Sequence, residues 1–141
     1  CLGYLEQEIP LCDATFSQTE LALLKTLAPL SLKPTLVLDR APEVNDAIGQ
    51  LLRKSHIVFF YTADKKEVRS WPVKADSDIV TCADKIHSDL ARGFIKADII
   101  GYDDFMQVYN MQEARARGLV KLVDRDYTIR EGDIIEIRFN V

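Results

Sequence analysis

The C-terminal stretch of this chain, which alternates apolar and polar side chains, constrains the fold more than any other feature. After Glu131-Gly132, four apolar residues alternate with Glu136, Arg138 and Asn140, which is the period-two pattern of a strand with one buried face. Burying four such side chains stabilises a fold by roughly 6–12 kcal/mol at most, comparable with a domain's whole stability margin of about 5–15 kcal/mol. We therefore expect this strand at the centre of a sheet, and its deletion to unfold the domain. The four residues are Ile135, Ile137, Phe139 and Val141.

The stretch at residues 57–73 predicts a β-hairpin. Two apolar segments, residues 57–62 and 68–73, flank a polar turn at residues 63–66, as antiparallel strands do. Pro72 lacks an amide donor, so we expect the second strand at an open edge of the sheet or already ending there.

Between the hairpin and the last strand, the pattern predicts a helix and further strands. Asp78 is the expected cap of a helix that continues to Gly93, and residues 94–100 alternate as a third strand. After a helical turn, shorter strands are expected at residues 119–123 and 127–129. In the third strand we assign Ile95, Ala97 and Ile99 to one face and Phe94, Lys96 and Asp98 to the other.

The first third of the chain predicts a partial α/β segment. Ser17 and Glu20 form a capping box at the start of a helix, and the apolar run at residues 33–38 is typical of a strand buried on both faces of a parallel sheet. Pro42 is expected in the first turn of a second helix, and we place a domain boundary near residues 54–56. The apolar stripe of the second helix consists of Val44, Ala47, Ile48, Leu51 and Leu52.

Size, charge and cysteine usage exclude several classes of protein. A chain of 141 residues, 48% of them hydrophobic, holds one ordinary core or one small domain and part of another. Its net charge of −4 and pI near 5.2 give no global basic field, so we expect no DNA partner and only local RNA contact. The three scattered cysteines form no Cys-x-x-Cys pair, which argues against a disulfide framework and a metal site.

The chain shows no membrane or secretion signal. No apolar run reaches the length of a membrane span and no signal peptide is recognisable, so we expect a cytoplasmic protein without membrane contact. A start at Cys1 is expected of a processed chain or of a piece of a longer one.

Four stretches of the C-terminal part carry a family resemblance. They are Phe59-Phe60-Tyr61-Thr62-Ala63-Asp64-Lys65-Lys66-Glu67-Val68-Arg69-Ser70-Trp71, the stretch from Ile86-His87-Ser88-Asp89 to Ile100, Tyr102-Asp103-Asp104, and the stretch from Asp126-Tyr127 to Val141. In this order they resemble the C-terminal TGS domain of the Obg-like ATPases of YchF type. The resemblance implies an α+β fold of the β-grasp (ubiquitin-like) type for residues 55–141, attached to a P-loop nucleotide hydrolase that works around ribosomes.

Residues 1–54 resemble an incomplete piece of that P-loop nucleotide-hydrolase domain, with a helix, a buried strand and a helix. The family's base-reading loop begins with Asn-x-x-Glu, whereas Asp39-Arg40-Ala41-Pro42 follows the predicted strand here, so we expect a solvated loop and no purine recognition. No G-x-x-x-x-G-K-[ST] motif is present in the sequence. We therefore expect this chain alone to bind no cofactor and to be inactive, since the family's ATP or GTP with Mg²⁺ would need that motif.

His87 is the sharpest binding candidate. It precedes Ser88-Asp89 and resembles the His-Thr/Ser-Asp motif shared among TGS domains, where an imidazole could stack on or hydrogen-bond to a base or ribose. Alternatively, the ring caps the helix C-terminus, where a partly positive imidazole is favourable. The sequence leaves both interpretations open.

Five cations could form a phosphate-binding patch if the hairpin tip and the third strand share a surface. Acidic residues are interleaved with them, so solvated surface ion pairs are the alternative. Three aromatic residues could similarly stack on single-stranded bases, although we expect them to pack on one another across the hairpin. The cations are Lys65, Lys66, Arg69, Arg92 and Lys96, and the aromatic residues are Phe59, Tyr61 and Trp71.

The function implied by the resemblance is a regulatory module that docks on the ribosome or RNA, or packs on its own or a partner's nucleotide-hydrolase domain. The alternative is a ubiquitin-like protein-interaction module without RNA contact, whose affinity would hardly depend on salt. No serine or cysteine has a sequence cue to an activating partner, so we assign no catalytic residue.

Overall fold

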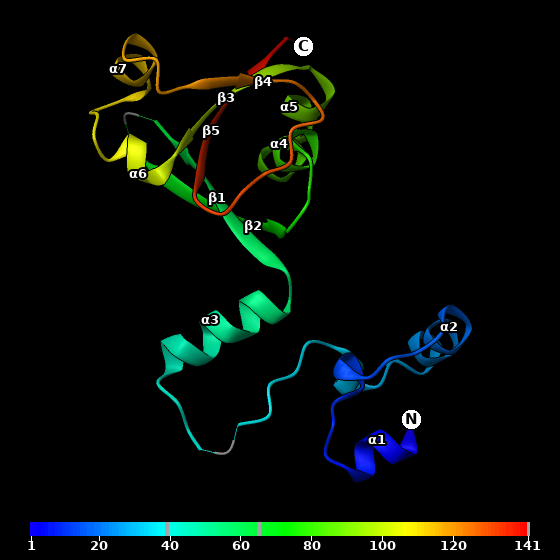
Figure 1. The fold of residues 1–141 in the computed structure, drawn as a ribbon. Helices are drawn as coiled ribbons and strands as arrows, with labels where there is room; N and C mark the ends of the chain where they lie inside the picture. Colours follow the sequence, from blue (N-terminus) through cyan, green and yellow to red (C-terminus); the bar gives the residue numbers. More distant parts are fainter. Residues whose placement is uncertain (39, 65, 141) are drawn as a thin grey trace. The chain divides into compact units, whose positions relative to one another are not determined.

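A computed structural model describes residues 1–38, 40–64 and 66–140. The chain divides into two compact units, Cys1–Ser55 and His56–Val141, whose elements are labelled in Figure 1. Within the described part of the chain, every helix is too short or too polar to cross a lipid bilayer.

The first unit is helical. Its predicted capping box is confirmed, because the amide of Glu20 donates to Ser17 Oγ at 3.3 Å and the amide of Ser17 donates to Glu20 Oε2 at 2.9 Å. The hydrogen bonds from Ser17 lower the pKa of the Glu20 carboxyl. The helices are α1 (Leu2–Glu6), α2 (Gln18–Leu27) and α3 (Val44–Lys54), with 3-10 turns η1 (Leu11–Asp13) and η2 (Leu30–Leu32).

The strand predicted at residues 33–38 is wrong. These residues form no helix or strand, and Val37 is 62% exposed. A strand buried in a parallel sheet needs a neighbouring strand on each side, and the described residues of the first unit contain no strand at all. Pro42 also lies outside the predicted helical turn, because Glu43 is the N-cap of α3.

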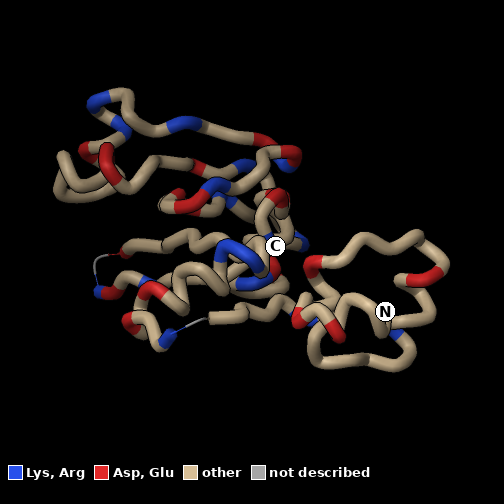
Figure 2. Tube along the Cα trace, turned by 60° about the horizontal axis from the view of Figure 1, so that its bottom comes forward, with Lys and Arg blue, Asp and Glu red and all other residues tan. Residues whose placement is uncertain are grey.

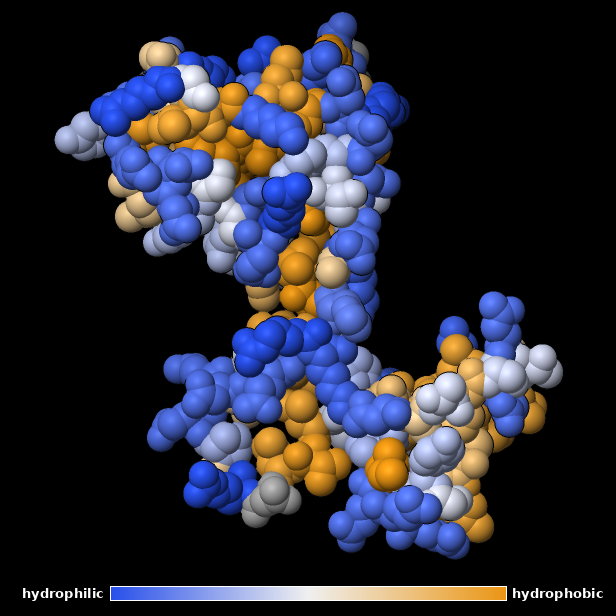
Figure 3. Space-filling model, in the orientation of Figure 1, coloured by the Kyte–Doolittle hydropathy of each residue, from blue (hydrophilic) through white to orange (hydrophobic). Residues whose placement is uncertain are grey.

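Helix α3 carries the apolar stripe that the sequence predicts for the second helix of this unit. This stripe is largely open to solvent. Val44, Ile48 and Leu51 are all exposed, and Figure 3 shows apolar surface below α3. The amphipathic pattern therefore predicted the helix correctly without identifying what covers it.

The second unit is built on a five-stranded mixed sheet with the order β2-β1-β5-β3-β4. β5 is antiparallel to β3 and parallel to β1, so the predicted central position of the last strand is confirmed. β1 and β2 form the predicted hairpin, and Pro72 lies on the edge strand β2 opposite Phe59. The strands are β1 (Ile57–Ala63), β2 (Val68–Lys74), β3 (Phe94–Gly101), β4 (Lys121–Val123) and β5 (Asp133–Phe139).

Helical segments cover both faces of this sheet (Figure 1). On one face, α4 (Ile79–Ile86) and α5 (Ser88–Arg92) pack on a core that includes Phe60, Ala97 and Ile135. On the other face, α6 (Tyr102–Phe105), α7 (Met111–Ala116) and their connections enclose a smaller core. That second core contains Ile100, Met111, Ala114 and Ile134. The fold of this unit is α+β, with two apolar layers separated by the sheet.

The predicted helix from Asp78 to Gly93 is interrupted. Asp78 caps it as expected, since its Oδ1 accepts from the amide of Thr81 at 2.7 Å. His87, however, has extended backbone angles of φ −166° and ψ 139°, and it separates α4 from α5.

Two strands depart from strict alternation. A register shift between Phe94 and Lys96 in the β3–β5 ladder puts Phe94 in the core with Ala97 and leaves Ile95 54% exposed, because a bulge adds one residue to a strand. Towards its end, β5 also leaves Phe139 49% exposed. The expected burial of four apolar side chains was too high, and Val141 lies outside the described residues.

Two further details of the prediction need correction. Residues 127–129 form only an isolated bridge, between Thr128 and Asp78, and no strand. Across the hairpin, the ring of Trp71 stacks on Phe60 with centroids 6.4 Å apart, not on Phe59 or Tyr61. Alternation explains this, because Phe60 and Trp71 are directly opposite one another and Phe59 and Tyr61 point to the other face.

Candidate binding surface

His87 lies at the junction of α4 and α5, with its side chain 65% exposed. Its Nδ1 accepts a hydrogen bond from the amide of Asp89 at 3.2 Å, which makes it the N-cap of α5. His87 is also the C-cap residue of α4, so its position at a helix C-terminus agrees with one of the two interpretations that the sequence left open. With Nδ1 engaged by the amide of Asp89, Nε2 is the ring nitrogen left to contact a ligand.

The predicted cations come from separate elements, and three of them pair with carboxylates. Arg69 on β2 contacts Glu67 at 2.7 Å, Arg92 on α5 contacts Asp89 at 2.8 Å, and Lys96 on β3 contacts Asp124 at 3.1 Å. These distances agree with the solvated ion pairs considered as the alternative. Lys66 is exposed in the hairpin turn, and Lys65 lies outside the described residues.

A different set of charged residues converges on Asp98, whose side chain is only 2% exposed. Arg115 donates from Nε at 3.1 Å and from Nη2 at 2.7 Å to Asp98 Oδ2. Arg138 donates to the same oxygen from Nε at 3.1 Å, and its Nη2 lies 3.0 Å from Oδ1. One buried carboxylate thus orients two guanidinium groups through charge-assisted hydrogen bonds.

The sheet register and α7 bring these residues together. Asp98 lies opposite Glu136 on β5, and Lys96 lies opposite Arg138. In α7, Met111 and Ala114 are buried, which places the next residue, Arg115, over the sheet. Arg115 then bridges Asp98 and Glu136, with 2.9 Å between Nη2 and Glu136 Oε2.

The guanidinium groups remain accessible although their carboxylate partner is buried. The side chain of Arg138 is 52% exposed and that of Arg115 is 33% exposed. The hydrogen bond to Asp98, and then that to Glu136, raises the pKa of the Arg115 guanidinium, so the group stays charged at any physiological pH. We call Lys96, Arg115 and Arg138 the arginine surface.

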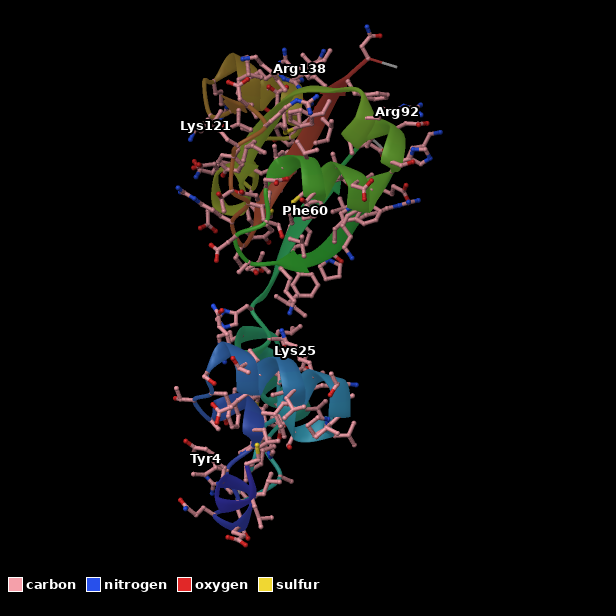
Figure 4. All side chains as sticks on the ribbon, turned by 90° about the vertical axis from the view of Figure 1, so that its right-hand side faces the viewer. Tyr4, Lys25, Phe60, Arg92, Lys121 and Arg138 are labelled. Carbon is pink, nitrogen blue, oxygen red and sulfur yellow. The ribbon has the colours of Figure 1, made fainter. Side chains whose placement is uncertain are left out.

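The arginine surface includes only one residue of the predicted set, Lys96. Sequence reasoning missed Arg115 and Arg138 because they lie 17 and 40 residues from Asp98 in the chain. Figure 4 labels Arg138 on β5 and Arg92 on the separate helix α5. Figure 2 shows that cationic and acidic residues are interleaved along the chain, without a large area of one sign.

No metal-binding cluster of histidine, cysteine or acidic residues is found among the described residues. The candidate site in the part of the chain that the structure describes is the arginine surface, which lies on an α+β domain.

Comparison with known proteins identifies the family. Residues 57–140 match a family model described as YchF-GTPase_C, protein of unknown function (DUF933), which is more than half of the chain. The chain therefore belongs to the YchF family and carries the domain that this model describes.

Two curated relatives are each named "Ribosome-binding ATPase YchF". The protein of Mycoplasma genitalium is 42% identical over 98 residues, covering 70% of this chain and 27% of that protein. That of Haemophilus ducreyi is 33% identical over 133 residues, covering 94% of this chain and 36% of that protein. The chain thus spans about a third of the length of these relatives.

A solved structure supports the fold. The Schizosaccharomyces pombe YchF GTPase matches with a TM-score of 0.64 over 87% of this chain and 30% of that chain, at 21% sequence identity. At this identity the match supports the fold alone.

Proposed function

We propose that this chain is the docking part of a YchF-type protein and binds ribosomal RNA through the arginine surface. Its second unit is the TGS domain of β-grasp type that the sequence predicts, and it acts in the cytoplasm in a regulatory role. The family membership and the names of the relatives support the ribosome as partner. The observation that carries the proposal is the fixed, half-exposed pair of guanidinium groups on Asp98.

Fixed guanidinium groups suit phosphate recognition. Asp98 and Glu136 engage the Nε and Nη2 donors, so a phosphate would be bound through the Nη1 donors and, in Arg138, through the second N–H of Nη2. Asp98 holds both groups in place before binding, so little side-chain entropy is lost. Lys96, directly opposite Arg138, adds a third cation. His87 is a further candidate, through Nε2.

Local charges limit the strength of this contact. Asp98, Glu136 and Asp124 balance the three cations, so we expect no long-range attraction of RNA. At most three phosphates would be contacted, and each adds about 0.7–0.9 to the slope of log affinity against log salt. The expected slope is therefore about 1–3, lower than that of strongly basic RNA-binding proteins.

Variants of the full chain test the proposal by co-sedimentation with ribosomes at low salt. We expect Arg138→Ala to weaken binding at least fivefold, and Arg53→Ala in the first unit, the matched control, to leave it unchanged. A loss in Arg92→Ala with none in Arg138→Ala would instead favour the patch predicted from sequence. Equal binding by all the variants would refute both surfaces.

The proposal assigns no nucleotide hydrolysis to this chain, whose sequence contains no G-x-x-x-x-G-K-[ST] motif. We keep the prediction that the chain binds neither ATP nor GTP, which a calorimetric titration with Mg²⁺ present would check. The alternative, a protein-interaction module without RNA contact, predicts ribosome binding that is indifferent to salt.

A further inference from the structure

A groove of about 340 Å³ opens where β5 extends past the end of β1. The β1–β2 hairpin forms one wall, β5 forms the other, and Ile86 and Leu90 from α4 and α5 lie between them. Of the charged network around Asp98, only Glu136 lines this groove. The groove is therefore a separate feature from the arginine surface.

Main-chain groups of β5 are open along this groove. The β1–β5 ladder pairs Tyr61 with Ile134, a register that sets Ala63, the last residue of β1, level with Glu136. β5 continues to Phe139 on β3, so no described strand lies beside Ile137–Phe139 on the β1 side.

The direction of these open groups follows from alternation. The amide of Asn140 donates to the carbonyl of Gly93, next to β3, at 2.9 Å. Successive amides in a strand point in opposite directions, so the amide of Phe139 points towards β1 but lies beyond Ala63, where β1 has ended. Unpaired groups of this kind are a template for a further strand.

The groove lining adds a chemical preference. Trp71, Ile86, Leu90 and Ile137 offer apolar contacts, whereas the charged side chains are three carboxylates and one guanidinium. Amides of Lys66 and Glu67 donate to Asp64 and lower the pKa of its carboxyl, so Asp64 is charged at neutral pH. Arg69 pairs with Glu67 and Arg115 pairs with Glu136, so the unbalanced charge of the groove is the carboxylate of Asp64, which disfavours nucleic acid and favours a basic side chain. The charged residues are Asp64, Glu67, Glu136 and Arg69.

We propose that this groove binds an extended polypeptide segment, in which apolar residues alternate with a lysine or arginine, as an added strand beside Ile137–Phe139. Backbone hydrogen bonds to β5 provide affinity, and the apolar floor and acidic rim select the side chains. This site goes beyond RNA docking and does not depend on it.

Trp71 lines the groove and is the only tryptophan of the chain, so its fluorescence reports occupancy directly. We would titrate the full chain with a blocked pentapeptide, Thr-Val-Arg-Val-Thr. We expect a saturable change in Trp71 emission. The same peptide with Glu in place of Arg, and a version with N-methyl groups on its two valines, are each expected to bind at least tenfold more weakly. No saturable change, or equal binding of all three peptides, would overturn the proposal.

Variants locate the site. Phe139→Pro removes the open amide, and we expect at least a tenfold loss of affinity, whereas Phe139→Ala keeps the amide and should lose less. Glu67→Lys is expected to weaken the Arg peptide, and Asp103→Lys is the matched control because α6 follows the opposite end of β3. If Phe139→Pro does not fold, the N-methylated peptide with the unmodified chain decides the same point. Equal losses of peptide affinity in Glu67→Lys and Asp103→Lys would contradict the claim that the acidic rim selects a basic side chain. Unchanged ribosome binding in Glu67→Lys would show that this site is separate from the arginine surface.

Discussion

Removing the charge of Asp98 is the sharpest test of the network that fixes the arginine surface. Asp98→Asn keeps the size of the side chain but leaves Arg115 and Arg138 without their shared carboxylate. Breaking a fully buried ion pair costs about 3–5 kcal/mol. Both guanidinium groups are partly exposed and can return to water, so we discount this to about 2–3 kcal/mol.

Urea unfolding, followed by the fluorescence of Trp71, measures this cost. With a denaturant dependence of about 2 kcal/mol per molar, the midpoint should fall by about 1 M, whereas that of Asp103→Asn, an exposed control, should hardly move. In the Asp98→Asn background, Arg138→Ala should cost much less than in the unmodified chain, because the two residues are coupled. A midpoint change below about 0.3 M for Asp98→Asn, or additive costs, would refute the claim that Asp98 fixes the arginines.

Three further predictions concern the rest of the second unit. Burial raises the pKa of the Cys82 thiol to about 12, so a thiol reagent at neutral pH should modify the exposed Cys1 and reach Cys82 only after unfolding. Burial, and then the hydrogen bond to Asp133, raises the pKa of Tyr127 to about 12 from 10.0. The neutral Tyr127 side chain therefore contributes its full stabilisation below pH 10, and this stabilisation is lost as the pH rises to 12. Denaturant midpoints should accordingly fall less across this range in Tyr127→Phe than in the unmodified chain. Deleting residues 133–140 removes the central strand, so the cooperative transition of the second unit should disappear in calorimetry.

The sequence predicted most of the sheet because its strands follow period-two patterns. Alternation in the last strand and the missing donor of Pro72 predicted a central strand and an edge strand, and both are confirmed. Alternation cannot locate an added residue, so it placed Ile95 on the same face as Ala97 and Ile99, although a bulge turns Ile95 outwards. The run at residues 33–38 failed for another reason, because apolar composition identifies a buried strand only when partner strands exist.

The candidate site was harder to predict than the fold. The predicted cations were chosen by charge and proximity in sequence, whereas the observed network depends on the register that places Asp98 beside Glu136 and Arg138. One signal was available: Asp98 lies among apolar residues in a predicted strand, and a buried carboxylate requires a partner. That signal would have pointed to an arginine without identifying which one.

The salt dependence of ribosome binding by the full chain tests the central claim most directly. Co-sedimentation from low to physiological salt should give a slope of log affinity against log salt of about 1–3, and Arg115→Ala together with Arg138→Ala should reduce that slope by about 1–2. Absence of binding at low salt, or binding with the same affinity at every salt concentration, would contradict docking through the arginine surface.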